Sequence, residues 1–159
     1  SIVAGRLAAS FGVVVARVVV TAAVADVYSK EGDAEYAKFF TKQLQTKGGY
    51  TKYLMFYYYA NFLTRMDKPV VLQGIKDIEA EAKNVAEQGW LIGAAQGSLK
   101  RISKIYGDKK TRAKADMAKE EGKTGKLELE ETIAGYDEII AAADDAAFIS
   151  VTGPVDDTV

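Results

Sequence analysis

Between residues 71 and 106, apolar side chains recur at steps of three and four, which is the spacing of one face of an α-helix. The members of this stripe are Val71, Ile75, Ile78, Ala82, Val85, Gly89, Ile92, Leu99 and Tyr106, with Gln96 and Ser103 as polar exceptions. Over about five heptads, such a stripe is typical of a helix that packs in a bundle or coiled coil. It predicts one long helix that begins near Pro69 and ends at Gly107.

Three further helices complete the predicted set. They span about residues 3–29, 34–66 and 127–148. Gly32 is expected to end the first helix and Asp33 to cap the second. The pair Gly48-Gly49 should kink or interrupt the second helix, because glycine is a poor residue inside a helix.

The sequence therefore predicts an all-α, up-down four-helix bundle that forms a single domain over residues 1–150. Residues 108–126 alternate Lys, Asp, Ala and Gly with few large apolar side chains. We interpret them as an exposed charged linker before the last helix, although their alanines are compatible with a short helix. Residues 151–159 are expected to form an acidic C-terminal tail.

Charge is divided unevenly along the chain. All 21 Lys and Arg residues lie before position 127, and residues 127–159 carry nine acidic residues. The basic region is interleaved with acids and alanines and lacks spaced aromatic platforms, so nucleic acid is not an expected partner.

The chain contains neither cysteine nor histidine. Thiolate zinc sites, disulfide frameworks, histidine-based catalytic pairs and the Glu-x-x-His ligands of bundle di-iron sites are thereby excluded. No phosphate-binding glycine loop or nucleophile elbow is present. We therefore predict no enzyme, no catalytic residues, no metal site and no cofactor.

The first 28 residues are very apolar and raise the question of a membrane span. In the window 7–25, seven valines and two larger apolar residues oppose a central Arg17, and the insertion free energies sum to about zero. Arg6, Ser10 and Thr21 lie close to Arg17 on a helix and make one narrow polar stripe. We expect a helix that is buried in the bundle except for one solvent-exposed edge. The alternative, a helix that lies at or in the bilayer, is kept as a second hypothesis.

Residues 50–62 contain seven of the sixteen aromatic residues of the chain. Successive helical residues point about 100° apart, so the rings at positions 56–59 surround the helix axis. One core cannot cover every side of a helix, and the outer rings are expected either at its rim or against a partner or pigment. We select Tyr57, Tyr58, Tyr59 and Phe62 as candidate partner-binding residues.

A glycine ladder lies inside the long predicted helix. Gly89, Gly93 and Gly97 follow one another at four-residue spacing. Such a ladder permits close approach of another helix backbone or of a flat ligand, and close helix packing is the preferred interpretation.

Lys100, Arg101 and Lys104 lie near the predicted end of the same helix, where cations complement the helix dipole. One interpretation is a solvated helix end. The other is a docking patch for an acidic partner, and we include the three residues among the candidate partner-binding residues.

The segment Gly97–Lys110, GSLKRISKIYGDKK, resembles the basic helix ending in Ile-Tyr-Gly of extrinsic lumenal proteins of photosystem II. These are the PsbQ family and the related four-helix extrinsic protein of diatoms and similar algae. The absence of Cys and His and the start at Ser1, as in a processed mature protein, agree with the resemblance. It implies a thylakoid-lumen subunit that docks on photosystem subunits and supports the ion environment of the manganese cluster without ligating it. The very apolar N-terminal segment departs from that pattern.

We therefore predict a non-catalytic accessory subunit of a membrane protein complex, membrane-associated through its partners. The most specific form is an extrinsic thylakoid-lumen subunit that stabilises photosystem II and its oxygen-evolving centre. One alternative is a subunit of another energy-transducing complex, such as the mitochondrial ATP synthase. The other is a soluble helical carrier that binds an apolar ligand against the glycine ladder and the aromatic belt.

Overall fold

The computed structural model describes residues 22–152, with side chains described for residues 32–148. Within this range the chain is helical, with short connections and no strand. The helices are α2 (Ala22–Thr46), α3 (Gly49–Leu63), α4 (Lys68–Asn84), α5 (Gly89–Lys119) and α6 (Lys123–Thr152). The all-α prediction is confirmed for these residues. The predicted four-helix bundle is not confirmed, because the described part of the chain forms five helices.

The chain divides into two compact units, residues 1–39 and 40–159. The first unit contains the beginning of α2, which continues through Gly32 and Asp33, so the predicted end and cap at these residues are wrong. The predicted helix at 3–29 lies largely outside the described residues, as does most of the predicted acidic tail. None of the described helices is long and apolar enough to cross a membrane.

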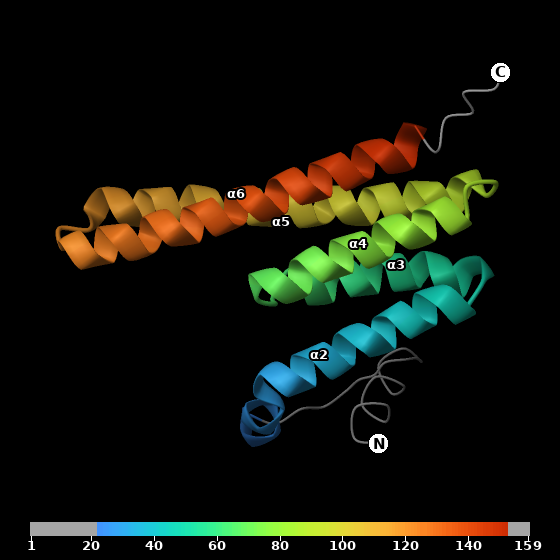
Figure 1. Cartoon of the computed structure of the whole chain (residues 1–159), viewed down its shortest axis with the longest axis horizontal. Helices are drawn as coiled ribbons and strands as arrows, with labels where there is room; N and C mark the ends of the chain where they lie inside the picture. The colour runs from blue at the N-terminus through green and yellow to red at the C-terminus, as the bar shows by residue number, and fades with distance from the viewer. Residues whose placement is uncertain (1–21, 153–159) are drawn as a thin grey trace. The chain divides into compact units, whose positions relative to one another are not determined.

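The second unit contains the last turns of α2 and all of α3–α6. The turns between α3, α4, α5 and α6 are short, so each of these helices runs antiparallel to the one before it (Figure 1). Helix α5 packs against α3, α4 and α6, and α4 also contacts α3 and α6. The largest fully buried side chains come from all of these helices and include Phe56, Tyr59, Leu63, Val71, Ile78, Leu91, Leu99, Ile102 and Ile139.

The predicted break at Gly48-Gly49 is confirmed. Helix α2 ends at Thr46, and Gly49 begins α3 with a φ of 55°. This left-handed backbone is favourable for glycine because it has no Cβ atom. The chain therefore reverses direction within two residues.

The prediction of a single helix from Pro69 to Gly107 is wrong in two respects. The chain breaks between Asn84 and Gly89, and Gly107 lies inside α5. At the break, the backbone N–H of Val85 bonds to the carbonyls of Glu81 and Ala82, and that of Gln88 bonds to Val85 O at 2.8 Å. Two antiparallel helices can bury their apolar stripes against each other, which one straight helix cannot do. The spacing of the stripe is nearly unchanged across the turn.

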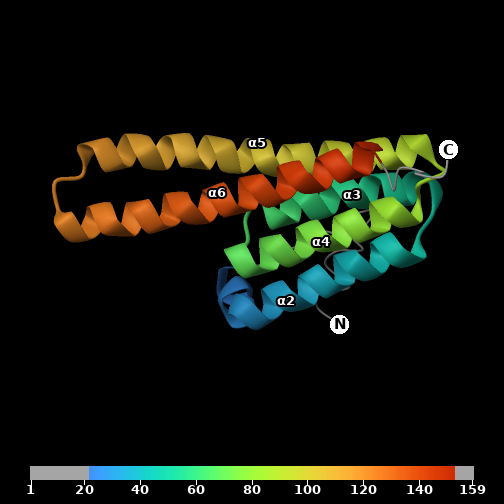
Figure 2. The same cartoon turned by 45° about the horizontal axis from the view of Figure 1, so that its top comes forward.

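The predicted linker at 108–126 is also wrong. Helix α5 continues to Lys119 and α6 begins at Lys123, so three residues connect them. Lys, Arg and Ala are good helix formers, and the side chain of Glu120 accepts the backbone N–H of Gly122 at 2.9 Å in the turn. The α5–α6 hairpin extends beyond the ends of α3 and α4 (Figure 2).

Candidate partner-binding surface

One face of α3 carries aromatic rings that belong to the core. Phe56, Tyr59 and Phe62 are buried. Phe40, in the last part of α2, stacks on the Tyr59 ring at 5.3 Å between centroids and lies 5.2 Å from the Phe62 ring. Tyr59 and Phe62, which the sequence suggested as partner-binding residues, are therefore packing residues in this fold.

The buried Tyr59 hydroxyl has polar partners. It donates to Asp77 Oδ2 at 3.2 Å, and Thr41 donates to the same oxygen at 2.9 Å. Burial raises the pKa of Tyr59 well above its ordinary value. The hydroxyl is satisfied by hydrogen bonds and stays protonated, so it contributes to the structure of the α2–α3–α4 contact.

The opposite face of α3 carries rings that remain accessible. Tyr50 is 68% exposed, and Tyr53 and Tyr57 are half-buried. Trp90, at the start of α5, is 49% exposed. The Trp90 ring stacks on Tyr53 with 5.8 Å between centroids and a 17° interplanar angle. The Tyr50 ring also stacks on Tyr53, with 5.8 Å between centroids and a 13° interplanar angle. Three nearly parallel rings thus lie at one end of the α3–α5 contact.

Tyr57 continues this row towards the middle of α3. Its ring is tilted against Tyr53 at 5.4 Å, and its hydroxyl lies over the backbone of Gly97. Burial and the neighbouring Tyr53 raise the pKa of Tyr57 above its ordinary value, so the phenol is protonated near neutral pH. Tyr58, also predicted to bind a partner, is half-buried.

One turn further along, Arg101 donates from Nε to the side-chain oxygen of Asn61. Three pairs therefore join the two helices in order: Tyr53 with Trp90, Tyr57 with Gly97, and Asn61 with Arg101. We call this strip the α3–α5 seam. Its residues are Tyr50, Tyr53, Tyr57, Asn61, Trp90, Gly97 and Arg101.

The predicted basic group lies along this seam and beside it. Lys100, Arg101 and Lys104 are all exposed. They lie in the middle of α5, so their predicted position near a helix end is wrong. Lys104 pairs with Asp108 at 3.1 Å on the same helix. Lys100 and Arg101 form no ion pair with any described residue. The structure thus brings Tyr57 and Arg101, selected separately from the sequence, onto one strip of surface.

The glycine ladder is used at one position only. A Cβ atom at Gly97 would collide with the Tyr57 hydroxyl, whereas nothing lies within 4 Å of a Cβ at Gly89 or Gly93. Close packing, predicted for all three, therefore applies to Gly97. Close packing also occurs at Gly74, which was not predicted: the Leu63 side chain lies against the backbone there and leaves no space for a Cβ.

A buried ion pair supports the inner side of α3. Lys52 Nζ bonds to Glu81 of α4, and Asn84 donates to the other carboxylate oxygen at 3.1 Å. Both charged side chains are almost completely buried. Because each charge has its partner in the core, the pair links α3 to α4.

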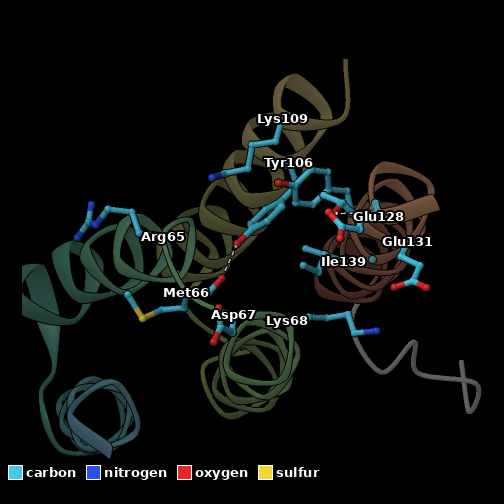
Figure 3. A pocket seen from close by; sticks show the side chains of 12 residues that line it. Arg65, Met66, Asp67, Lys68, Tyr106, Lys109, Glu128, Glu131 and Ile139 are labelled. Atoms are coloured by element: carbon cyan, nitrogen blue, oxygen red, sulfur yellow. Dashed lines mark hydrogen bonds between the residues drawn. The ribbon is translucent and has the colours of Figure 1, made fainter. Parts of the chain in front are cut away.

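A pocket of about 570 Å³ opens between the end of α3, the start of α4 and the facing sides of α5 and α6 (Figure 3). Met66, Ile139 and the rings of Tyr106 and Tyr136 form its apolar part. The charged side chains in its wall are Arg65, Asp67, Lys68, Lys109, Glu128 and Glu131. Cations and carboxylates thus face the same space, so its charge selects neither an anion nor a cation.

Tyr106, in the wall of this pocket, links α5 to the turn after α3. Its hydroxyl lies 3.1 Å from both Leu63 O and Met66 O, at the turn that follows α3 (Figure 3). Burial raises the pKa of Tyr106 to about 12. No group of side chains able to hold a metal ion is present among the described residues.

Comparisons with protein-family models, with curated proteins and with solved structures found no match to this chain.

Four seam residues were not predicted to bind a partner: Tyr50, Tyr53, Asn61 and Trp90. A signal for the first two was present, because Tyr50, Tyr53 and Tyr57 follow steps of three and four. No comparable signal connects Trp90 or Asn61 to this row. Their places in the seam depend on how α5 lies against α3.

Proposed function

We propose that this protein is a non-catalytic accessory subunit of a larger protein complex and that the α3–α5 seam is its docking surface. The observation that carries the proposal is the accessible stack of Tyr50, Tyr53 and Trp90. Tyrosine and tryptophan are enriched at the energetic centres of protein interfaces. Because these rings are already held against one another, less side-chain entropy is lost on docking.

The packing of α3–α6 supports a rigid scaffold for this surface. Consecutive helices are antiparallel, and α5 contacts the other three. We propose that these helices act as a variant of the up-down four-helix bundle, with an extended α5–α6 hairpin.

The specific complex is proposed from the sequence resemblance of Gly97–Lys110 to extrinsic photosystem II proteins. The likeness lies in the residues alone, since α5 continues past Gly107 to Lys119. On this proposal the chain docks from the thylakoid lumen and stabilises the oxygen-evolving centre without binding its metal. Arg101 belongs to this segment and to the seam, which connects the resemblance to the accessible rings. The corresponding proposal for a mitochondrial complex shares the docking surface and differs in the partner.

The first experiment is a native gel of membranes from the source organism, run before and after a high-salt wash and analysed for peptides of this chain. Co-migration with photosystem II that salt removes is the expected result. Co-migration with another complex would replace the photosystem proposal while keeping the accessory role. A chain found only in the free soluble fraction would contradict both.

A rebinding assay then tests the seam itself. Washed membranes are incubated with purified wild type, with Tyr50→Ala/Trp90→Ala, or with Leu127→Ala. Leu127 is 52% exposed near the start of α6, at the far end of the hairpin from Trp90. The double variant should lose at least about tenfold in affinity, and the Leu127 variant should bind as wild type does. Equal binding of all three would contradict docking through the seam.

The pocket supports a second candidate, a carrier of a small amphipathic molecule. Its volume of about 570 Å³ lies within the range of ligand sites, and two tyrosine rings line it. A carrier predicts a co-purified compound, detected by mass spectrometry of the denatured protein. Tyr136→Ala should reduce its recovery, and absence of any compound in protein from the native source would exclude this candidate.

A further inference from the structure

The two ends of the seam differ in side-chain chemistry, with aromatic rings at one end and cations at the other. From this we infer that its partner is an acidic protein segment that carries an apolar anchor. The anchor contacts Tyr50, Tyr53 and Trp90, and the carboxylates contact Arg101 and Lys100. This inference rests on the proposed docking function and adds the chemistry of the partner.

The charge of the seam is positive because the parts of α3 and α5 that form it contribute no acid. Helix α3 has no Asp or Glu, and α5 has none before Asp108. The nearest acid along the chain at the aromatic end is Glu87, in the turn before Trp90. An acidic ligand thus meets unpaired cations at Lys100 and Arg101, whereas a basic ligand would meet like charge.

Arg101 is arranged to bind a carboxylate. Its Nε donates to Asn61, which holds the guanidinium group at the surface of the seam. The two terminal nitrogens form no hydrogen bond or ion pair with a described residue. Arginine binds carboxylates through two parallel N–H donors, and a positioned fork loses less side-chain freedom on binding.

The spacing along α3 fixes the length of the partner segment. From Tyr50 to Asn61 the helix rises about 16 Å. An extended segment covers this distance with about five residues. Between the two ends, Gly93 is exposed and has nothing within 4 Å of a Cβ position, so a bound segment can approach the α5 backbone there.

The same arrangement disfavours two other anionic partners. Single-stranded nucleic acids need cations beside the stacking rings to meet the phosphates, and the cations of the seam lie at the opposite end. A lipid surface is best met by cations placed around an apolar patch. A linear ligand with one apolar end and one acidic end fits the observed order of residues.

Trp90 is the only tryptophan of the chain, so its fluorescence reports directly on the aromatic end. Two synthetic peptides of about ten residues serve as probes, a length that spans the seam with margin. Both carry Leu-Pro near one end and lack aromatic residues. One carries a run of glutamates about five residues further on, and the other carries glutamines at the same positions.

The glutamate peptide should shift Trp90 emission saturably, and the glutamine peptide should bind at least about tenfold more weakly. Arg101→Gln should reduce the affinity for the glutamate peptide to that for the glutamine peptide. Lys114→Gln is the matched control, because Lys114 is exposed on the same helix beyond the seam. Circular dichroism of each variant establishes that folding is unchanged.

Equal affinity for both peptides, or no saturable shift with the glutamate peptide, would overturn the inference. So would a Trp90 shift with phosphatidylglycerol vesicles that exceeds the peptide response. The rebinding assay separates the two proposals. If Tyr50→Ala/Trp90→Ala loses the complex and Arg101→Gln does not, the docking function stands and the acidic partner is rejected.

Discussion

Helix α3 carries aromatic rings on two faces, and the same residue types have different roles on each. Phe56, Tyr59 and Phe62 are enclosed by neighbouring helices, whereas Tyr50 and Tyr53 remain accessible beside Trp90. Both faces are aromatic, and the difference in exposure arises from which helices cover each face. An aromatic run in a sequence therefore indicates neither a core nor an interface until its neighbours are placed.

The largest effect should come from removing a ring on the buried face. Phe56→Ala creates a cavity around a fully buried side chain and should reduce the free energy of unfolding by about 3–5 kcal/mol. Tyr50→Ala, on the accessible face, should change it by less than about 0.5 kcal/mol. Urea denaturation followed by circular dichroism measures both, and similar values would remove the distinction between the two faces.

A slightly smaller effect is expected at the buried ion pair. Lys52→Met leaves the Glu81 carboxylate without its cation and should reduce the free energy of unfolding by about 3 kcal/mol. The double variant Lys52→Met/Glu81→Met removes both charges and should recover most of this loss. A double variant as unstable as the single one would show that the loss does not come from an unpaired Glu81 charge.

The next largest effect should come from alkaline pH, which should lower the free energy of unfolding through Tyr106, the residue bonded to the end of α3. Burial raises the pKa of Tyr106 from 10.0 to about 12. The folded state thus favours the protonated phenol, and the stability it contributes is complete below pH 10 and lost as the pH rises to about 12. The expected loss is about 2–3 kcal/mol at the upper limit.

Phenolate absorbance and urea denaturation across this pH range measure the effect of Tyr106. Tyr106→Phe is the control, because it cannot ionise. It should be less stable than wild type at neutral pH by about 1 kcal/mol, through the lost hydrogen bond, and should depend less on pH above 10. An identical pH dependence would assign the alkaline loss to other groups.

The smallest effects distinguish open from closed positions on the seam side of α5. Gly93→Ala should stabilise the protein by about 0.5–1 kcal/mol, because nothing occupies the Cβ position and alanine favours a helix. Gly97→Ala should not share this gain, since the new methyl group meets the Tyr57 hydroxyl. Equal melting temperatures for both variants would contradict the contact between Tyr57 and Gly97.

Apolar spacing was sufficient to predict helices, and the interruption at Gly48-Gly49 was predictable because paired glycines disfavour a helix. The break between Asn84 and Gly89 was not, since the stripe keeps a helical rhythm across the turn. Residues 108–119 were misassigned for the opposite reason. They lack a strong apolar stripe, but lysine, arginine and alanine sustain a helix that one neighbour, α6, partly covers.

Part of the candidate site was predictable in the same way. The exposure of Lys100, Arg101 and Lys104 agrees with the prediction. Their position in the middle of α5 does not, because the helix continues past Gly107 to Lys119. The division of the aromatic belt was not predictable, because rings at positions 56–59 surround the helix. The packing of the last turns of α2, of α4 and of α5 decides which rings are covered. The pairing of Asn61 with Arg101 joins residues forty positions apart and has no local signal.

The extension of the α5–α6 hairpin affects where the protein unfolds locally. Beyond the ends of α3 and α4, its two helices are covered only by each other among the described helices of this unit, and Ala113 and Ile133 are its main buried side chains. Such a region exchanges its amide hydrogens through local opening at a lower free energy than the rest. Among residues 32–148, limited proteolysis should therefore cut first near residues 120–122 and leave a protected fragment that retains Trp90 and the rings of α3.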